Sequence, residues 1–404
     1  MMNPLPLLRA EWRRNPWGNL AIVLLIALAV ALGVAVSAQE RALRLGSGRA
    51  ADRFDLLVGA PGSQTQLVLT GVYLQPAALP LLDGAVLQRL QADPGVAWLS
   101  PIAFGDFHQG HPVVGVTADF VTAGGRTALA EGRVFAAHGE AVVGADVPLA
   151  LGAEFAPLHG ANPAAAQIAG HAHGGHGYRV VGRLPRGGTP WDRAILAPVE
   201  AVWEVHGLPA GHADEARLGP PWDAPFVAPV PALVVKPKGV ADAYRLRAAY
   251  RGKDSMALFP AEVMVELYRT LGDARDVLAL VAVGTQVLVV AAVLLAVFAT
   301  LAARRRQIAV LRALGATRGY VFLAVWLQVA LLVGAGAGLG LLLGWGGALG
   351  LSAAMAARTG LALPVGLGGA EFAMAGALAL AGSALAALPA LAAFRRPPAA
   401  GLRQ

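Results

Sequence analysis

The chain has 404 residues, of which 56% are hydrophobic and only 14% are charged. Soluble globular proteins carry about 25% charged residues, so this composition excludes an ordinary soluble enzyme, and its apolar content excludes a disordered chain. The chain contains no cysteine, which excludes disulfides, thiol catalysis and Cys-ligated zinc.

Four segments contain no Asp, Glu, Lys or Arg: 15–39, 277–303, 319–357 and 372–394. Each reaches the roughly 20 residues that a helix needs to cross the hydrocarbon core of a bilayer. The sequence therefore predicts an α-helical membrane protein with four transmembrane helices, at 17–38, 277–303, 320–346 and 372–394. Two short helices within 319–357 would instead make five spans and place the arginines after 394 outside, against the positive-inside rule.

The basic residues follow the same topology. The net charge is +7, yet residues 39–276 hold 20 Lys and Arg against 23 Asp and Glu. Of the remaining 12 basic residues, all except Arg358 flank the apolar segments on one side. The positive-inside rule then places three segments in the cytoplasm of a multi-pass inner-membrane protein: 1–16, 304–319 and 395–404. A nucleic-acid partner is not expected, because its basic patch would lie on a folded soluble domain.

The first apolar segment has two interpretations. Arg9, Arg13 and Arg14 resemble the positive region of a signal peptide, and Val36-Ser37-Ala38 resembles a cleavage site. The apolar stretch exceeds the 7–15 residues of a usual signal peptide, which favours an uncleaved span. Both interpretations leave the orientation of the later spans unchanged.

Residues 39–276 are predicted to form a large mixed α/β extracytoplasmic domain. Apolar stretches bounded by Gly and Pro predict strands at Phe54–Val58, Gln66–Leu74, Val113–Val116, Tyr178–Leu184 and Pro231–Val235. Helical periodicity is found at Ala194–His206, Val240–Tyr250 and Ala261–Val277. The last helix continues into the second span and would form a rigid stalk. We expect two halves, 39–105 with 226–276 and 106–225, and a short external loop at 347–371 broken by Gly360 and Pro364.

The cytoplasmic connection reads RRRQIAVLRALGATR over residues 304–318. At 3.6 residues per turn, Ile308, Leu311 and Leu314 or Gly315 share one face, and Arg305 and Arg312 share another. The pattern predicts a short amphipathic helix at the cytoplasmic surface. Its simplest role would be contact with anionic membrane lipid.

This segment resembles the signature of FtsX-like ABC transporter permeases, the family of MacB and of LolC and LolE. The core Arg312-Ala313-Leu314-Gly315-Ala316 matches, whereas Gln307 stands where the family has an acidic residue. Residues 178–207, with their Gly-Thr-Pro turn, and the tail after Pro389 are also similar. The resemblance implies four spans, a MacB-like periplasmic domain, and a coupling helix that docks on an ATPase through Arg305, Gln307, Ile308, Leu311, Arg312, Leu314, Gly315 and Ala316.

The chain has no phosphate-binding Gly-x-x-x-x-Gly-Lys-[Ser/Thr] motif, so we expect neither enzymatic activity nor a catalytic residue. The resemblance implies that ATP-Mg is bound by a partner ABC ATPase dimer. Further implied partners are a second permease copy, identical or different, and a periplasmic binding or adaptor protein. Nucleotide binding would move the external domain by mechanotransmission, to export, extract or release cargo. Two alternatives are a non-transporting regulator of an extracytoplasmic hydrolase and a membrane-anchored metal-binding sensor.

All nine histidines lie between His108 and His212. His171, His173 and His176 fall in a Gly/Ala-rich segment, about 153–177, that resembles an insertion relative to the family. Neutral imidazoles suit zinc, so we hypothesise a zinc site with a fourth ligand from His159, His206, His212 or Asp214. The alternative is a solvated loop that binds metal adventitiously.

The third apolar segment is rich in glycine. Its small residues are suited to close helix packing, which fits a dimer seam, or they reflect Ala/Gly-rich composition alone. They are Gly334, Gly336, Gly338, Gly340, Gly344, Gly346 and Gly347.

Overall fold

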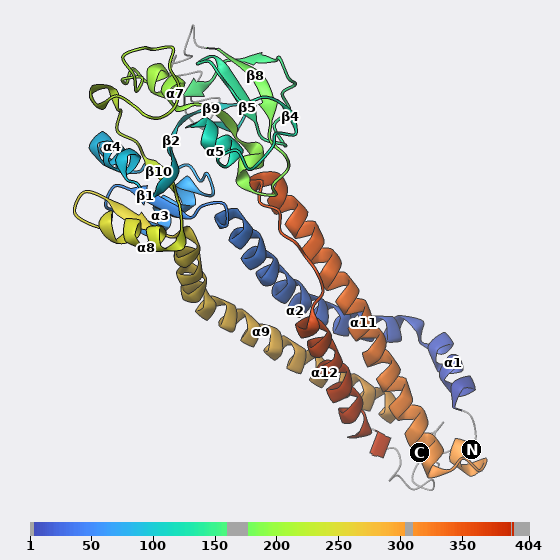
Figure 1. Ribbon diagram of the computed structural model, residues 1–404. Helices are drawn as coiled ribbons and strands as arrows, with labels where there is room; N and C mark the ends of the chain where they lie inside the picture. Colours follow the sequence, from blue (N-terminus) through green and yellow to red (C-terminus); the bar gives the residue numbers. More distant parts are fainter. Residues whose placement is uncertain (1–3, 160–176, 304–309, 389, 392–404) are drawn as a thin grey trace. The chain divides into compact units, whose positions relative to one another are not determined.

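The structure is a computed structural model that describes residues 4–159, 177–303, 310–388 and 390–391 (Figure 1). It divides into two compact units. The helical unit combines residues 1–43, 271–354 and 363–404, and the α/β unit combines residues 44–270 with 355–362. A short piece of chain at the end of the third apolar segment thus belongs to the α/β unit.

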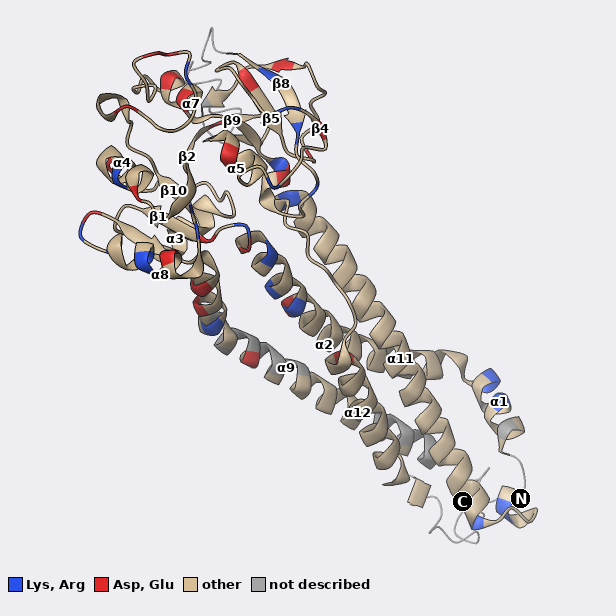
Figure 2. Ribbon diagram, in the orientation of Figure 1, with Lys and Arg blue, Asp and Glu red and all other residues tan. Residues whose placement is uncertain are grey.

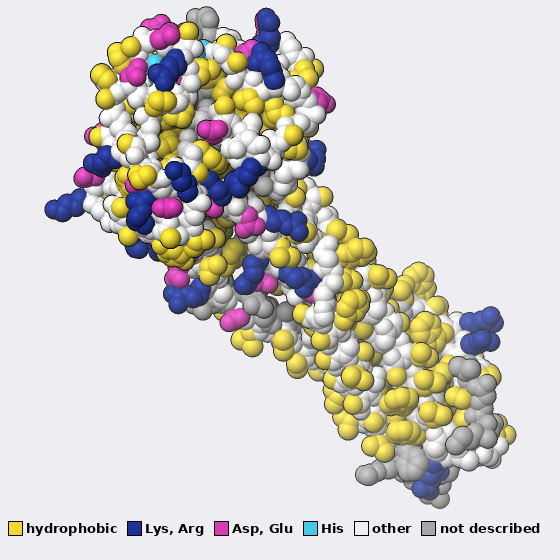
Figure 3. Space-filling model, viewed as in Figure 1, with side chains coloured by type: hydrophobic (Ala, Val, Ile, Leu, Met, Phe, Trp, Pro, Cys, Tyr) yellow, Lys and Arg dark blue, Asp and Glu magenta, His cyan; other side chains and the backbone are white. Residues whose placement is uncertain are grey.

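The long helices are α1 (Leu5–Arg14), α2 (Pro16–Ala51), α9 (Pro260–Ala303), α11 (Arg318–Thr359) and α12 (Gly369–Leu385). Among the described residues, α2 and α11 are long and apolar enough to cross a membrane. The helices at the other two predicted spans contain shorter apolar stretches, Val283–Ala292 and Gly369–Leu385. Hydrophobic side chains are spread over the visible surface of the helical unit, where few charged ones lie (Figure 3). The four-span topology itself stays a prediction.

Close contact between α2 and α11 organises the helical unit. A Cβ added to Gly336, Gly340 or Gly344 would lie 2.6 Å from an atom of α2. These glycines recur every four residues and therefore share one face of α11. Ile26, Val30 and Val34 of α2 pack at this contact within the buried core of the unit.

The dimer-seam hypothesis is therefore wrong for these three glycines. They pack against a helix of the same chain, because the absent Cβ lets two backbones of one bundle approach closely. Gly334, Gly338, Gly346 and Gly347 have no atom within 4 Å of an added Cβ among the described residues.

The α/β unit contains one mixed sheet in the order β11-β1-β10-β2-β3-β9-β5-β8-β4, with β6 beside β8 and β7 beside β2. The strands are β1 (Leu56–Gly59), β2 (Val96–His108), β3 (His111–Val116), β4 (Glu131–Gly132), β5 (Glu140–Val143), β6 (Glu154–Phe155), β7 (Leu158–His159), β8 (Tyr178–Arg183), β9 (Ile195–Pro198), β10 (Ala232–Pro237) and β11 (Met256–Leu258).

Strand β2 joins the two predicted halves. Its first part, up to Ile102, pairs with β10, and its second part, from Ala103, pairs with β3. The inserted half is therefore continuous with the first half through one long strand. Buried side chains form a core on each side of the sheet.

The smaller helices are α3 (Gln64–Gly71), α4 (Gly84–Ala92), α5 (Ala118–Thr122), α7 (Val199–Val205) and α8 (Val240–Ala249). The strand predicted at Gln66–Leu74 is wrong. Ser63 caps α3 by accepting a hydrogen bond from the Gln66 backbone N–H, and the apolar residues form the buried face of that helix.

The helix predicted at Ala194–His206 is correct only in its second half. Its first residues form β9, which pairs in parallel with β3. Pro198 ends the strand because proline cannot donate a hydrogen bond to the ladder.

Helix α11 also differs from the sequence prediction. Residues 347–359, predicted as loop, are helical. Alanine and leucine favour helix here, and the helix ends at Gly360, whose φ of +72° suits glycine. The predicted continuity of the stalk with the second apolar segment agrees with the single helix α9.

Candidate functional site

The chain turns sharply before α11, and we call residues 310–317 the elbow. Residues 310–313 are helical, and Gly315 follows with a φ of +101°. The Gly315 N–H donates to the Arg312 carbonyl at 3.2 Å, and the Ala316 N–H donates to the Leu311 carbonyl at 3.0 Å. This pair of bonds is the Schellman motif, which ends a helix at a glycine.

Thr317 starts the next helix directly. Its hydroxyl accepts a hydrogen bond from the Tyr320 N–H at 3.2 Å, and its carbonyl accepts one from the Val321 N–H at 3.3 Å. Such an N-cap satisfies a donor that the first turn of a helix leaves unpaired. The sequence Leu-Gly-Ala-Thr thus ends one helix and begins another within four residues.

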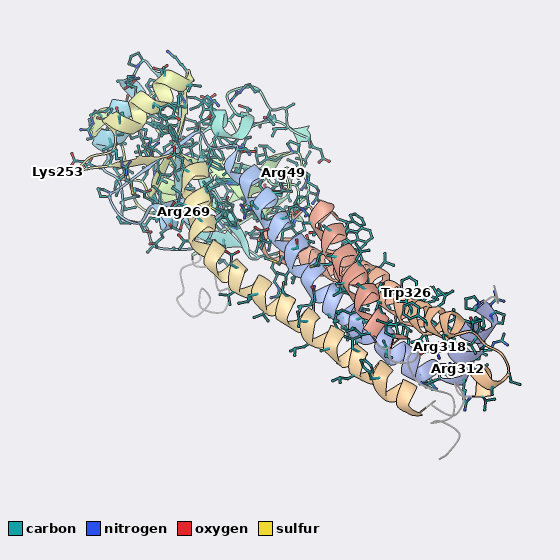
Figure 4. All side chains as sticks on the ribbon, turned by 90° about the horizontal axis from the view of Figure 1, so that it is seen from below. Arg49, Lys253, Arg269, Arg312, Arg318 and Trp326 are labelled. Carbon is teal, nitrogen blue, oxygen red and sulfur yellow. The ribbon has the colours of Figure 1, made fainter. Side chains whose placement is uncertain are left out.

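The elbow presents apolar side chains to its surroundings. Leu314 is 81% exposed and Val310 is 44% exposed. Arg312 and Arg318 lie at the same end of the helical unit (Figure 4). Two exposed apolar side chains and two basic residues therefore lie close together in the sequence at this end of the unit. Of the predicted coupling residues, Leu311, Arg312, Leu314, Gly315 and Ala316 belong to this elbow, whereas Arg305, Gln307 and Ile308 lie outside the described residues.

The other end of α11 is held by what we call the external clasp, formed by Gly188, Arg193, Ala357, Arg358 and Ala362. The Arg193 guanidinium donates to the carbonyl of Ala357 at 3.1 Å and also to that of Arg358. The Ala362 N–H donates to the Gly188 carbonyl at 2.9 Å. A cation at the last carbonyls of a helix is favourable, because they carry the negative end of the helix dipole.

The Gly-Thr-Pro turn presents Arg193 to the helix. The buried carboxylate of Asp192 accepts hydrogen bonds from the Gly187 and Gly188 N–H groups at 2.8 and 2.7 Å. The Arg193 carbonyl in turn lies 2.9 Å from His111 Nδ1. Arg53 lies nearby, and burial lowers its pKa while Asp192 opposes that shift. The turn is thus fixed from both sides of Arg193.

A pocket of about 500 Å³ lies beside the clasp, and its lining includes His111, Asp146, Arg186, Asp192 and Gly360. Arg186 and Asp146 form an ion pair at 2.5 Å across part of it. Sequence reasoning singled out the Gly-Thr-Pro turn only as a family likeness and missed Arg193. The sequence did contain a signal for Arg193, which is a basic residue just after a rigid turn.

A buried ion pair joins α2 to the start of α12. Glu371 has 0% exposure, and its carboxylate accepts from Ser37 Oγ at 2.7 Å, from Arg41 Nη1 at 2.9 Å and from the Gly368 N–H at 2.7 Å. Arg41 also donates to the carbonyl of Gly366. Sequence reasoning did not use Glu371, although it is one of only two acidic residues outside 39–276. Among the residues that Figure 2 colours by charge, few acidic ones lie in the helical unit.

The hypothesised zinc ligands His171, His173 and His176 lie outside the described residues. Of the fourth-ligand candidates, His206 has its Nε2 3.8 Å from Oδ1 of buried Asp106, and His159 pairs in register with Asp106 across β7 and β2. His212 contacts the backbone, with its Nε2 2.9 Å from the Gly219 carbonyl. The described part of the chain holds no group of three or more potential metal ligands.

A comparison with protein families gives one match, and the matched residues include both the elbow and the end of α11. Residues 279–398 match the family model for the FtsX-like permease C-terminal domain. This part of the chain is therefore similar to FtsX-like permeases. The resemblance inferred from the segment at 304–318 is therefore confirmed. FtsX-like permeases are membrane subunits of ABC transporters and work with ATPase partners.

A comparison with solved structures finds the extracellular domain of the noncanonic ABC-type transporter YknZ from Gram-positive bacteria. The identity is 12%, the match covers 50% of this chain and 98% of that domain, and the TM-score is 0.30. A TM-score this low does not establish a common fold. No curated protein sequence matches the chain.

Proposed function

We propose that this FtsX-like permease transmits nucleotide-driven movement of a partner ATPase to its own extracytoplasmic domain, and that α11 carries part of this movement. The observation that supports this proposal is that α11 is one continuous helix of 42 residues. It begins at the elbow and ends in the external clasp. In this mechanism cargo is exported, extracted or released by the moving domain.

A helix of this length can act as a rigid rod. At 1.5 Å per residue, α11 is roughly 60 Å long. Its start is fixed by the Thr317 cap, and its last carbonyls are fixed by Arg193. In this proposal a displacement of the elbow would be transmitted along α11 toward its last residues. The stalk part of α9 would provide a second connection, as the sequence analysis predicts.

The proposed assembly follows from the family. Two permease chains would sit on an ATPase dimer that binds ATP-Mg, and residues 39–276 would lie outside a cytoplasmic membrane that is crossed four times. The exposed Leu314 and Val310 would contact the ATPase, because an apolar side chain at the end of a short helix suits a groove on a partner. A periplasmic binding or adaptor protein would act beyond the external domain.

Co-purification tests the coupling role. We expect Leu314→Asp, and independently Leu311→Asp, to abolish recovery of the ATPase with the full-length permease while membrane insertion is unchanged. Leu208→Asp is the matched control, since Leu208 is an exposed leucine of the α/β unit. Equal recovery of the ATPase with Leu314→Asp and Leu208→Asp would contradict the proposal.

We also propose that the external domain binds zinc through His171, His173 and His176, with His206 as the fourth ligand. Support comes from His206 and His159, two fourth-ligand candidates that lie beside buried Asp106. Equilibrium dialysis of the full chain against zinc should show loss of binding in H171A/H173A/H176A. His138→Ala is the control, because His138 lies beside Glu204 and is not among the candidate ligands. Unchanged zinc binding in the triple variant would exclude the site.

A further inference from the structure

The N-terminal helix α1, residues Leu5–Arg14, has a surface that the permease mechanism does not use. Leu8 is only 4% exposed and marks the buried side of the helix. Arg9 and Arg13 are exposed and, being four residues apart, lie on one face of the helix. Trp12, which is 39% exposed, lies between the buried and the basic sides.

The chain changes direction after α1 (Figure 1). Asn15 interrupts the helix, and its side chain accepts a hydrogen bond from the Gly18 N–H at 3.3 Å. Pro16 follows as the first residue of α2, a position where proline is well tolerated. The break makes α1 a separate helix, and Trp17, which is 80% exposed, stands at the start of the apolar α2.

The charges on α1 differ from those of the α/β unit. There, exposed arginines such as Arg133, Arg179 and Arg245 form ion pairs with carboxylates. Arg9 and Arg13 form no hydrogen bond or ion pair with any part of the chain that the structure describes. Two basic side chains without a counter-charge, next to an exposed tryptophan and an apolar helix, match a negatively charged surface with an apolar interior.

We propose that α1 binds the anionic phospholipid headgroups of the membrane that α2 enters, with Arg9 and Arg13 contacting lipid phosphates and Trp12 and Trp17 lying at the interface. Amphipathic basic helices bind membranes in this way, and tryptophan prefers the boundary between headgroups and hydrocarbon. The inference rests on the proposed membrane span of α2 but not on ATPase coupling. Anionic lipid would then fix the entry of α2, the helix against which α11 packs.

The test uses the full chain in lipid nanodiscs. Because the protein has no cysteine, Ala10→Cys provides a single site for the environment-sensitive fluorophore NBD. We expect its emission to shift to the blue in discs that mix phosphatidylglycerol with phosphatidylcholine, relative to discs of phosphatidylcholine alone. High salt should reverse the shift, because the attraction is electrostatic.

Arg9→Gln with Arg13→Gln should abolish the shift. The same variant should reduce the enrichment of retained phosphatidylglycerol, counted by native mass spectrometry, by roughly fivefold for each arginine. Arg126→Gln with Lys253→Gln is the control, because it removes the same charge from exposed sites of the α/β unit.

Two results would overturn the proposal. One is identical emission in both kinds of disc, with no effect of the double variant. The other is a shift that appears only when the ATPase is added, which would show that α1 contacts protein instead of lipid. Neither result bears on the Leu314 test, so failure of this inference and failure of ATPase coupling are distinguishable.

Discussion

In the helical unit, α11 approaches α2 so closely that three glycines leave no room for a Cβ, whereas the sheet of the α/β unit is covered by large side chains such as Trp191 and Trp203. The ion pairs of the two units also differ in how deeply they are buried. The pair of Arg41 with Glu371 is buried at the carboxylate, and the pair of Arg179 with Glu154 is exposed at both ends. Lipid gives helices no hydrophobic reason to associate, so close packing and buried polar contacts must hold the bundle.

The largest effect should come from breaking the buried ion pair. Arg41→Ala leaves Glu371 without its cation, and an unpaired buried charge costs about 3–5 kcal/mol. The exposed counterpart, Arg179→Ala, should cost at most about 1 kcal/mol. Thermal unfolding of the purified chain in detergent measures both. Similar losses in the two variants would remove the distinction between the units.

Overpacking the glycine contact should have the next largest effect. Gly340→Leu places side-chain atoms where the Ala27 carbonyl and Val30 of α2 already lie, and overpacking of this kind costs about 1–3 kcal/mol or more. Gly338→Leu is the matched control, since its added Cβ meets no atom within 4 Å. The yield of folded protein and its unfolding midpoint give the readout. If Gly338→Leu were equally damaging, that face of α11 would pack against another molecule.

Arg193→Ala should loosen the end of α11 from the Gly-Thr-Pro turn, with a cost of about 1–2 kcal/mol for the lost cation at the helix end. Spin labels on cysteines introduced at Arg358 and Leu151, both exposed and both in the α/β unit, would report the distance by pulsed EPR. We expect one narrow distribution with Arg193 and a broad one without it. Arg126→Ala is the control, and a distribution that stays narrow in Arg193→Ala would remove the external clasp from the proposed mechanism.

The smallest effect concerns pH. The Arg133 guanidinium holds the pKa of Glu140 at about 2, below its ordinary value of 4.5. A depressed pKa stabilises the folded state above pH 4.5, and this contribution is lost as the pH falls from 4.5 toward 2. Because the pair lies at the surface, we expect less than about 1 kcal/mol. Unfolding midpoints of wild type and Glu140→Gln should therefore differ slightly at pH 6 and converge near pH 2, and a difference that grows on acidification would contradict the assignment.

The sequence analysis predicted one amphipathic helix that included Gly315, whereas the chain leaves the helix there and forms the elbow. Leu-Gly-Ala-Thr contains a helix stop and a helix start in adjacent positions, so its geometry depends on neighbours in sequence alone. The end of α11 was predicted too early, because the span was assigned to 320–346 and the residues after it to a loop, whereas the helix continues to Thr359. For Gln66–Leu74, an apolar run of strand length was assigned as a strand, and the Ser63 cap was the overlooked signal.

The sequence by itself determined the apolar segments, the basic residues that flank them and the likeness to FtsX-like permeases. Each of these depends on composition or on contacts within a few residues. Only the tertiary structure decided that Arg193 caps a helix 164 residues away in sequence, that Glu371 meets Ser37 and Arg41, and which glycines face α2. Such pairings depend on how distant segments pack, and no local pattern in a single sequence records that packing.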